Sequence, residues 1–163
     1  MLTFGHLLDL AKVDRRAVRL LRHQDTRYPG CPSPYVLWRD HRDRFEAYQA
    51  TQSFNDEAKL RAPIWASFVG LPRRETLFVG LYGAEPTGPL KEDRQHPLSG
   101  AIESAGSCNY YKLELQDELA EFAGRLWIEW GEGYRSWIQR GDGIEKRIVE
   151  LRRDLSEPAF PGF

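Results

Sequence analysis

The side chains that could carry out catalysis are few, and none of them completes a recognised arrangement. His23 and Asp25 form a His-x-Asp pair that could ligate a metal, but no second cluster of ligands accompanies them. Glu57 and Lys59 match the Glu-x-Lys fragment of a nuclease signature, but they fall in a segment predicted to be helical rather than extended. Cys108 could pair with a histidine, yet spacing alone brings no histidine beside it. We therefore expect no catalytic residue, no metal ion and no cofactor in this chain.

Aromatic residues give a stronger chemical signal. They exceed what the interior of a small barrel needs, and alternation along strands should turn some of them into an open mouth. An aromatic face can stack on a nucleobase for about 1–3 kcal/mol. The alternative is that most of these rings are core residues. The predicted stacking and pocket residues are Trp65, Tyr82 and Trp137, with Ser67 beside them.

Two amides and four arginines are candidates for the other contacts with nucleic acid. Gln49 and Gln52 lie at i, i+3 on one face of a predicted helix, where they could read base edges or simply be hydrated. Arg135 and Arg140 flank Trp137, a pattern that suits phosphate contacts beside a stacking ring. Surface salt bridges are the competing explanation for the arginines. The predicted phosphate-binding residues are Arg22, Arg39, Arg135 and Arg140.

The charge of the chain is nearly balanced but unevenly distributed. A formal net charge of −1 argues against a protein that coats phosphate backbones without specificity. Residues 1–45 carry nine Lys and Arg against five Asp and Glu, a local net of +4, which leaves the other 118 residues at −5. This distribution predicts a localised positive patch near the N-terminus. The alternative is that the arginines form the solvated faces of amphipathic helices.

Helical spacing of apolar residues dominates the first part of the chain. It predicts a helix over residues 4–11 and a second helix, capped by Asp14, over residues 14–22. Pro34 should begin a third helix that runs to residue 53. A short helical turn should follow over residues 55–60.

Strand patterns dominate the rest of the chain. The predicted strands cover residues 65–69, 77–82, 110–115, 125–130, 134–139 and 145–151. The first two should pair antiparallel across a short connection, and the last two should form a glycine-rich hairpin. Residues 85–107 show no periodicity and predict a long loop that could act as a lid or a rim.

These elements predict an α+β fold, with N-terminal helices in residues 1–61 packed on a small, curved, mostly antiparallel β-barrel in residues 62–156. A length of 163 residues is typical of one domain, and residues 157–163 have the composition of a linker that begins after it. The chain has neither an apolar run of about 20 residues nor an export signal. We therefore expect a cytoplasmic location, with Cys31 and Cys108 reduced.

Several longer segments resemble the N-terminal region of bacterial GIY-YIG nuclease-family proteins. They are YVLWRD at 35–40, FEAYQATQ at 45–52, APIWASFV at 62–69, WGEGYRSWIQ at 130–139 and EPAFPGF at 157–163. The resemblance implies a domain that precedes a GIY-YIG endonuclease module in a restriction or defence protein. Phe78-Val79-Gly80 echoes one strand of the nuclease signature, but nothing upstream supplies the other. The chain itself should therefore not cut DNA.

The curved barrel with an aromatic mouth is also similar to PUA-like domains, which include readers that flip a modified cytosine into a pocket. The leading hypothesis is thus a non-catalytic DNA-binding domain that recognises a modified base and directs an attached nuclease. Two alternatives remain open. One is a protein-interaction or dimerisation module, in which case the chain could form a homodimer. The other is a sensor of a small nucleotide ligand.

Overall fold

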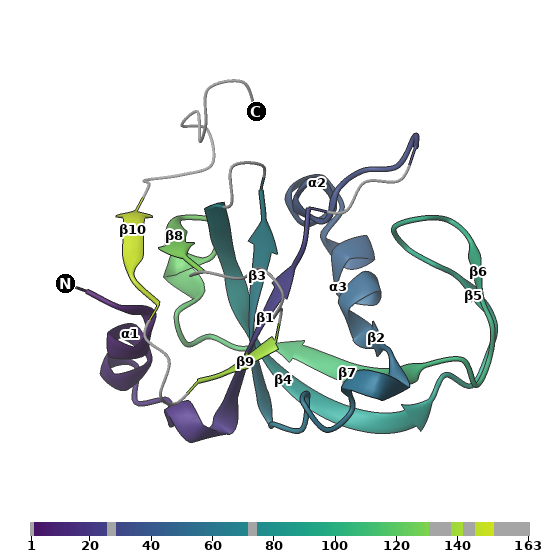
Figure 1. Cartoon of the computed structure of the whole chain (residues 1–163), viewed down its shortest axis with the longest axis horizontal. Coiled ribbons are helices and arrows are strands. Elements are labelled where there is room, and N and C mark those ends of the chain that lie inside the picture. The colour runs from purple at the N-terminus through teal and green to yellow at the C-terminus, as the bar shows by residue number, and fades with distance from the viewer. Residues whose placement is uncertain (1, 26–28, 72–74, 131–137, 142–145, 152–163) are drawn as a thin grey trace.

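The computed structural model describes residues 2–25, 29–71, 75–130, 138–141 and 146–151. Its centre is a curled, mostly antiparallel half-barrel sheet with helices packed on it (Figure 1), so the predicted α+β fold class is confirmed. The main path of the sheet contains β10 (Ile148–Leu151), β8 (Leu126–Glu129), β4 (Glu75–Pro89), β3 (Ile64–Gly70), β1 (Val18–His23) and β9 (Ile138–Arg140), in that order. Off this path, β7 (Asn109–Leu115) pairs with β4, and β2 (Thr51–Gln52) pairs with β7.

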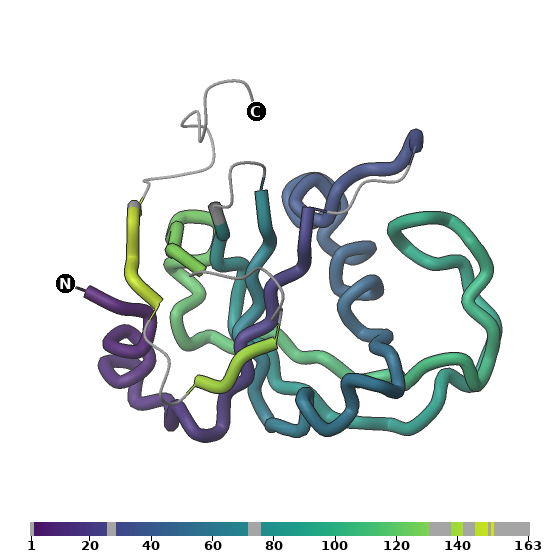
Figure 2. The backbone as a smooth tube through the Cα atoms, in the orientation of Figure 1, coloured from purple at the N-terminus to yellow at the C-terminus, as the bar shows by residue number. Residues whose placement is uncertain are grey.

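Strand β4 is the central strand of the sheet, because it pairs with three other strands. Along one edge, residues 76–83 pair with β3, which confirms the predicted antiparallel pair. Along the other edge, residues 75–77 pair with β8 and residues 82–89 pair with β7. The tube in Figure 2 shows how the chain bends as β4 leaves β8 and runs alongside β7. Only the middle of this strand was predicted from the sequence.

Side chains alternate between the two faces of the sheet, and each face has its own core. On the first, the α1 face, Phe68 and Phe78 pack against Phe4 of α1 (Phe4–Leu10), with ring centroids 5.2 and 5.3 Å from it. On the second, the α3 face, Val69 and Leu77 pack against α2 (Pro34–Asp40) and α3 (Arg42–Ala50). Two-sided burial explains why the strand sequences are so rich in apolar residues.

The alternation along β4 is interrupted by one extra residue, Val79, which has no partner in β3. Ser67 of β3 lies opposite Gly80, while the next residue, Phe68, lies opposite Phe78, so the register shifts between them. Gly80 has a φ of +144°, and a Cβ at this position would lie 2.8 Å from Cδ1 of Leu115. Glycine is the residue that tolerates both conditions.

The predicted helix over residues 34–53 is two helices. Ser33 caps α2 by accepting a hydrogen bond from the backbone of Val36, so the predicted start at Pro34 is confirmed. The helix breaks at His41, and Arg42 stabilises the break by donating from Nε to the Trp38 carbonyl at 2.7 Å. The break lets both helices follow the curved sheet. Within the described ranges, no helix is long and apolar enough to cross a lipid bilayer.

The predicted helix over residues 14–22 is wrong. Asp14 caps only a 3₁₀ turn, η1 (Arg15–Ala17), after which the chain enters β1. This strand lies between β3, to which it is parallel, and β9, and five of its six residues are buried. Burial on both faces removes the polar alternation that marks a strand, so its apolar residues imitate helical spacing. The predicted division into a helical and a β-rich part therefore fails at β1 and β2.

The predicted hairpin between residues 134–139 and 145–151 is also wrong. Strand β9 pairs with β1, whereas β10 pairs with β8 at the other end of the sheet path. Gly141 serves a different purpose from a hairpin turn. Its backbone N–H donates to the Val18 carbonyl at 2.9 Å, and a Cβ there would lie 2.5 Å from the Arg15 carbonyl oxygen. The glycine therefore allows close approach to β1.

The segment 85–107 is more ordered than the sequence predicts. It holds the end of β4 and a small sheet of β5 (Arg94–Gln95) and β6 (Ile102–Glu103). Arg94 donates from Nε to Glu103 at 2.7 Å and from Nη2 to the Ala47 carbonyl at 2.8 Å. Leu98 is buried in the core of the α3 face. These contacts fix the segment against α3.

A buried polar network joins α3 to the sheet. Oε1 of Gln49 accepts a hydrogen bond from the Ser67 hydroxyl and lies 2.8 Å from Nε2 of His23. All three residues are buried. Desolvation lowers the pKa of His23 to about 4, although the bond to Gln49 favours the charged ring. The neutral imidazole is therefore the form that donates to Gln49.

The burial of His23 predicts that the protein loses stability as the pH falls below about 6.5. The unfolded chain takes up a proton near pH 6.5, whereas folded His23 resists protonation down to a pKa of about 4. The free energy of unfolding should fall by about 2 kcal/mol between pH 7 and pH 5. Urea denaturation at these pH values measures this change. His96, whose pKa burial also lowers, contributes with the same sign. The His23→Gln variant isolates the His23 share, and an unchanged pH dependence in that variant would contradict the assignment.

A second prediction concerns the bulge in β4. Gly80→Ala adds a Cβ that meets Leu115 and must adopt a positive φ, so it should lower the free energy of unfolding by about 2–4 kcal/mol. Gly100→Ala is the matched control, because Gly100 has a φ of +75° but open space around it. A loss in Gly80→Ala no larger than that in Gly100→Ala would contradict the role assigned to Gly80.

Candidate functional site

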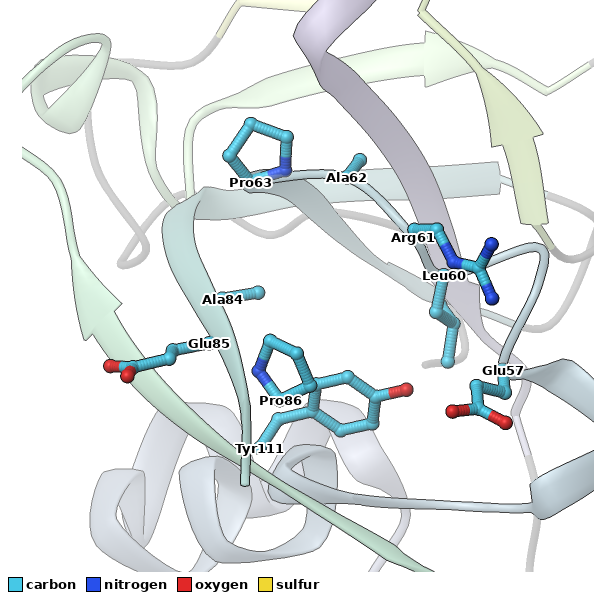
Figure 3. A pocket seen from close by; sticks show the side chains of 9 residues that line it. All are labelled: Glu57, Leu60, Arg61, Ala62, Pro63, Ala84, Glu85, Pro86 and Tyr111. Atoms are coloured by element: carbon cyan, nitrogen blue, oxygen red, sulfur yellow. The ribbon is translucent and has the colours of Figure 1, made fainter. Parts of the chain in front are cut away.

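A pocket of about 350 Å³ opens between the segment that precedes β3 and the β4–β7 ribbon, the antiparallel pair formed by residues 82–89 and 109–115. In Figure 3 the ring of Tyr111 and the side chain of Leu60 point into this space, while the carboxylate of Glu85 points away from it. We call it the Tyr111 pocket. Its lining residues are Glu57, Leu60, Arg61, Ala62, Pro63, Ala84, Glu85, Pro86 and Tyr111.

The Tyr111 ring is held in place by the core behind it. Trp65 of β3 contacts it with a centroid distance of 4.7 Å and an interplanar angle of 58°. The indole N–H of Trp65 donates to the Leu60 carbonyl at 3.2 Å, so the same side chain also fixes the opposite wall. A buried aromatic residue with its polar atom satisfied is a rigid support. The pocket is therefore preformed.

The local sequence explains the walls. Ser53 caps the 3₁₀ turn η2 (Phe54–Asp56), and the turn continues until the Leu60 N–H bonds to the Asp56 carbonyl at 3.0 Å. Pro63 then ends the turn just before β3. On the ribbon, Pro86 lies opposite Tyr111 in the register of β4 and β7. Two prolines and a tyrosine thus supply flat, rigid surfaces.

One end of the pocket is polar. Figure 3 places the Tyr111 hydroxyl on the side of the Glu57 carboxylate and the Arg61 guanidinium. Burial, followed by the Glu57 and Asp56 carboxylates, raises the pKa of Tyr111. The hydroxyl therefore stays protonated and can donate as well as accept. Such an arrangement can hold a flat apolar ring that presents an amino group to Glu57, but it contains no activated nucleophile.

The predicted stacking residues lie behind this pocket. Trp65 and Ser67 are completely buried, and Tyr82 is buried against α3, where desolvation and the Glu46 carboxylate raise its pKa. In this structure none of the three presents a surface to a ligand, because alternation turns them towards α3 and the core. Trp137 lies outside the described residues. Trp65 is the one that the fold brings next to the pocket wall.

The predicted base-edge amides are also internal. Gln49 bonds with His23 and Ser67, and Gln52 donates from Nε2 to the Gln49 carbonyl at 2.8 Å. The Nε2 group of Gln49 has no hydrogen-bond partner and is buried. Both amides connect α3 and β2 to the sheet, and neither is exposed to a base edge in this structure.

The predicted phosphate-binding arginines are dispersed. Arg22 is buried, and its Nε donates to Thr76 at 3.1 Å, so its head group faces the core. Arg39 is exposed but forms two hydrogen bonds of 2.9 Å with Asp40. Arg140 is exposed at the end of β9. Arg135 lies outside the described residues.

Two arginines of the predicted positive patch are engaged in local ion pairs. Arg15 pairs with Asp9 at 2.7 Å, and Arg16 pairs with Asp14 at 3.2 Å. The pKa values of both aspartates are lowered, first by the hydrogen bonds from these arginines. Exposed pairs of this kind add little stability. They do reduce the local field of the predicted patch.

The residues of two catalytic alternatives, His23 and Cys108, contact other groups in the structure. His23 faces Gln49, and the described residues contain no group of three or more His, Cys, Asp or Glu that could hold a metal. Cys108 contacts Glu103 and Ser107, and burial raises the pKa of its thiol. A protonated thiol is a poor nucleophile. Cys31 and Cys108 are both free thiols.

Sequence reasoning did not assign Tyr111 to the site, although it predicted the strand on which Tyr111 lies. The signal was the alternation along β7, where Tyr111 and Leu113 share one face while Tyr110 and Lys112 share the other. The walls formed by residues 57–63 gave no signal, because their approach to Tyr111 depends on the tertiary fold.

Comparison of the chain with protein-family models, with curated proteins and with solved structures found no match. The resemblance to the region that precedes GIY-YIG nuclease modules therefore remains a prediction, and the likeness to PUA-like domains rests on the curved sheet alone.

Proposed function

We propose that this chain is a non-catalytic DNA-binding domain that takes one base, a modified cytosine, into the Tyr111 pocket. The observation that carries the proposal is the preformed aromatic pocket, in which Tyr111 faces apolar walls and Glu57 stands at the polar end. In the full-length protein, the domain would direct an attached GIY-YIG nuclease module to its target.

The size and chemistry of the pocket favour a single base. A volume of about 350 Å³ is near the lower limit for ligand pockets, so it suits one small ring system better than a larger ligand. Cytosine presents an exocyclic amino group, and a carboxylate such as Glu57 is a natural acceptor for it. A base in a duplex must leave the stack to reach a concave site of this kind.

The charge of the molecule agrees with selective rather than indiscriminate binding. The net charge is −1, and Glu57 and Glu85 stand at the pocket. Such a surface gives weak attraction to unmodified duplex, so most of the binding energy must come from the base itself. Discrimination between modified and unmodified duplex then depends on contacts in the Tyr111 pocket.

A protein-interaction module is the second candidate, and the outer strand β10 favours it. Val149 and Leu151 of this strand are 55% and 51% exposed. Exposed apolar residues on an edge strand invite pairing with another chain. Sedimentation across a range of protein concentrations tests this candidate. A dimer that Val149→Lys abolishes, in a protein that ignores DNA, would favour it over base recognition.

The proposal predicts selective binding to a modified duplex. Matched duplexes with cytosine, 5-methylcytosine, 5-hydroxymethylcytosine or glucosylated cytosine are titrated by fluorescence anisotropy near physiological salt. One modified duplex should bind at least about tenfold more tightly than the plain duplex, whose Kd should lie at about 10⁻⁴–10⁻⁶ M. Equal weak binding to all four would contradict the proposal.

Variants locate the binding in the pocket. Tyr111→Ala and Glu57→Gln should each remove about 1–3 kcal/mol of binding to the preferred duplex, and Glu57→Gln should weaken binding to the other cytosine duplexes as well, because all four bases carry the amino group that Glu57 accepts. Tyr111→Phe tests the hydroxyl alone. Glu121→Gln is the matched control, because Glu121 is exposed and lies outside the pocket lining. Loss of binding in the control as well would point to a general charge effect.

A further inference from the structure

The opposite face of the β4–β7 ribbon carries a second groove, of about 570 Å³, that the proposed base site does not use. Tyr110 and Lys112 reach it because they alternate along β7 with the residues that face the Tyr111 pocket. We call it the Tyr110 groove. Its lining residues are Thr87, Pro89, Leu90, Lys91, Glu92, Tyr110 and Lys112.

The backbone around the Tyr110 groove is fixed by hydrogen bonds. The register of β4 and β7 shifts between Pro86 and Pro89, and the Thr87 hydroxyl in this bulge donates to the Tyr110 carbonyl at 2.7 Å. The Leu90 N–H then donates to the Cys108 carbonyl at 2.8 Å. These bonds hold the two sides of the groove, and with them Lys91 and Tyr110, in a set arrangement.

The side chains in the groove combine positive charge with an aromatic surface. Lys91 and Lys112 are exposed, and neither forms an ion pair or a side-chain hydrogen bond with any of the residues that the structure describes. Tyr110 is 38% exposed, in contrast to the buried Tyr111 beside it. Glu92 is the single acidic residue in the lining, and Glu85 lies opposite Lys112 in the register of β4 and β7, so the lysines supply local positive charge beside two carboxylates rather than a net positive balance.

We propose that the Tyr110 groove binds a nucleotide unit of a single-stranded nucleic acid, with a base on the Tyr110 ring and phosphates at Lys91 and Lys112. Aromatic stacking beside lysines is the usual combination in proteins that bind single strands. A duplex offers no free base face to a tyrosine, so an unpaired segment suits the groove better. The inference rests on the proposed function in one respect, that the ligand is nucleic acid.

The test is a titration of the whole chain against a fluorescein-labelled oligothymidine of about 12 nucleotides, at several salt concentrations. Tyr110→Ala should weaken binding at least about fivefold, while Tyr110→Phe, which keeps the ring, should bind like the parent protein. In Lys91→Gln/Lys112→Gln, the slope of log K against log salt should fall by about 1.4, because two phosphate contacts are lost from a single strand. Lys12→Gln, which removes an exposed lysine after α1, should change neither quantity.

The experiments distinguish failure of the Tyr110 groove inference from failure of the Tyr111 pocket proposal. Groove variants that weaken oligothymidine binding support the inference, even if no duplex is preferred and the base-recognition proposal fails. Oligothymidine binding that falls in Tyr111→Ala but not in the groove variants would overturn the inference and leave the pocket proposal intact. Displacement of the oligonucleotide by a polyglutamate peptide at equal charge concentration would also overturn it, because the groove would then recognise negative charge alone.

Discussion

The pairing of β4 along its whole length is the constraint on which the rest of the structure depends. One edge of β4 follows β3, whereas the other edge is divided between β8 and β7. A strand can pair in this way only if it bends between the two partners, and Gly80 lies in the interval that neither partner covers. The bulge there keeps Phe78 and Leu81 in the same core although they are three residues apart. This glycine and its register shift, together with the bulge between Pro86 and Pro89, bend β4 within the half-barrel.

The bend also creates the β4–β7 ribbon, whose two faces differ in chemistry. Along β7, Tyr111 turns towards Trp65 and the core, while Tyr110 turns outwards beside Lys112. The segment 57–63 closes over the first face and makes a pocket, whereas no segment among the described residues closes over the second in the same way. Two adjacent tyrosines thus lie in different environments, because successive side chains of a strand point to opposite faces.

The sequence predicted those elements whose signals are local. The strands at residues 65–69, 77–82 and 110–115 and the start of α2 at Pro34 follow from β-propensity, alternation and capping. The sequence could not predict β1, because burial between two partner strands erased its alternation. The sequence also could not predict which strands pair with β9 and β10, or that Leu60 approaches Tyr111. Each of these features depends on contacts between distant segments.

The placement of the aromatic residues explains why the proposed pocket lies next to the residues predicted from the sequence rather than at them. The number of aromatic residues in a sequence does not tell which rings support the core and which could bind a ligand. The hydrogen-bond partner of the polar atom on each ring does distinguish them. The Trp65 N–H donates its hydrogen bond to the Leu60 carbonyl, so the polar atom of this side chain is satisfied without a ligand. The Tyr111 hydroxyl has no hydrogen-bond partner among the described residues and stands at the open pocket beside Glu57. A polar group without an internal partner can form its hydrogen bond with a ligand instead. We therefore assign the proposed binding roles to the tyrosines of β7, with the tryptophan behind them as the rigid support that such a site needs.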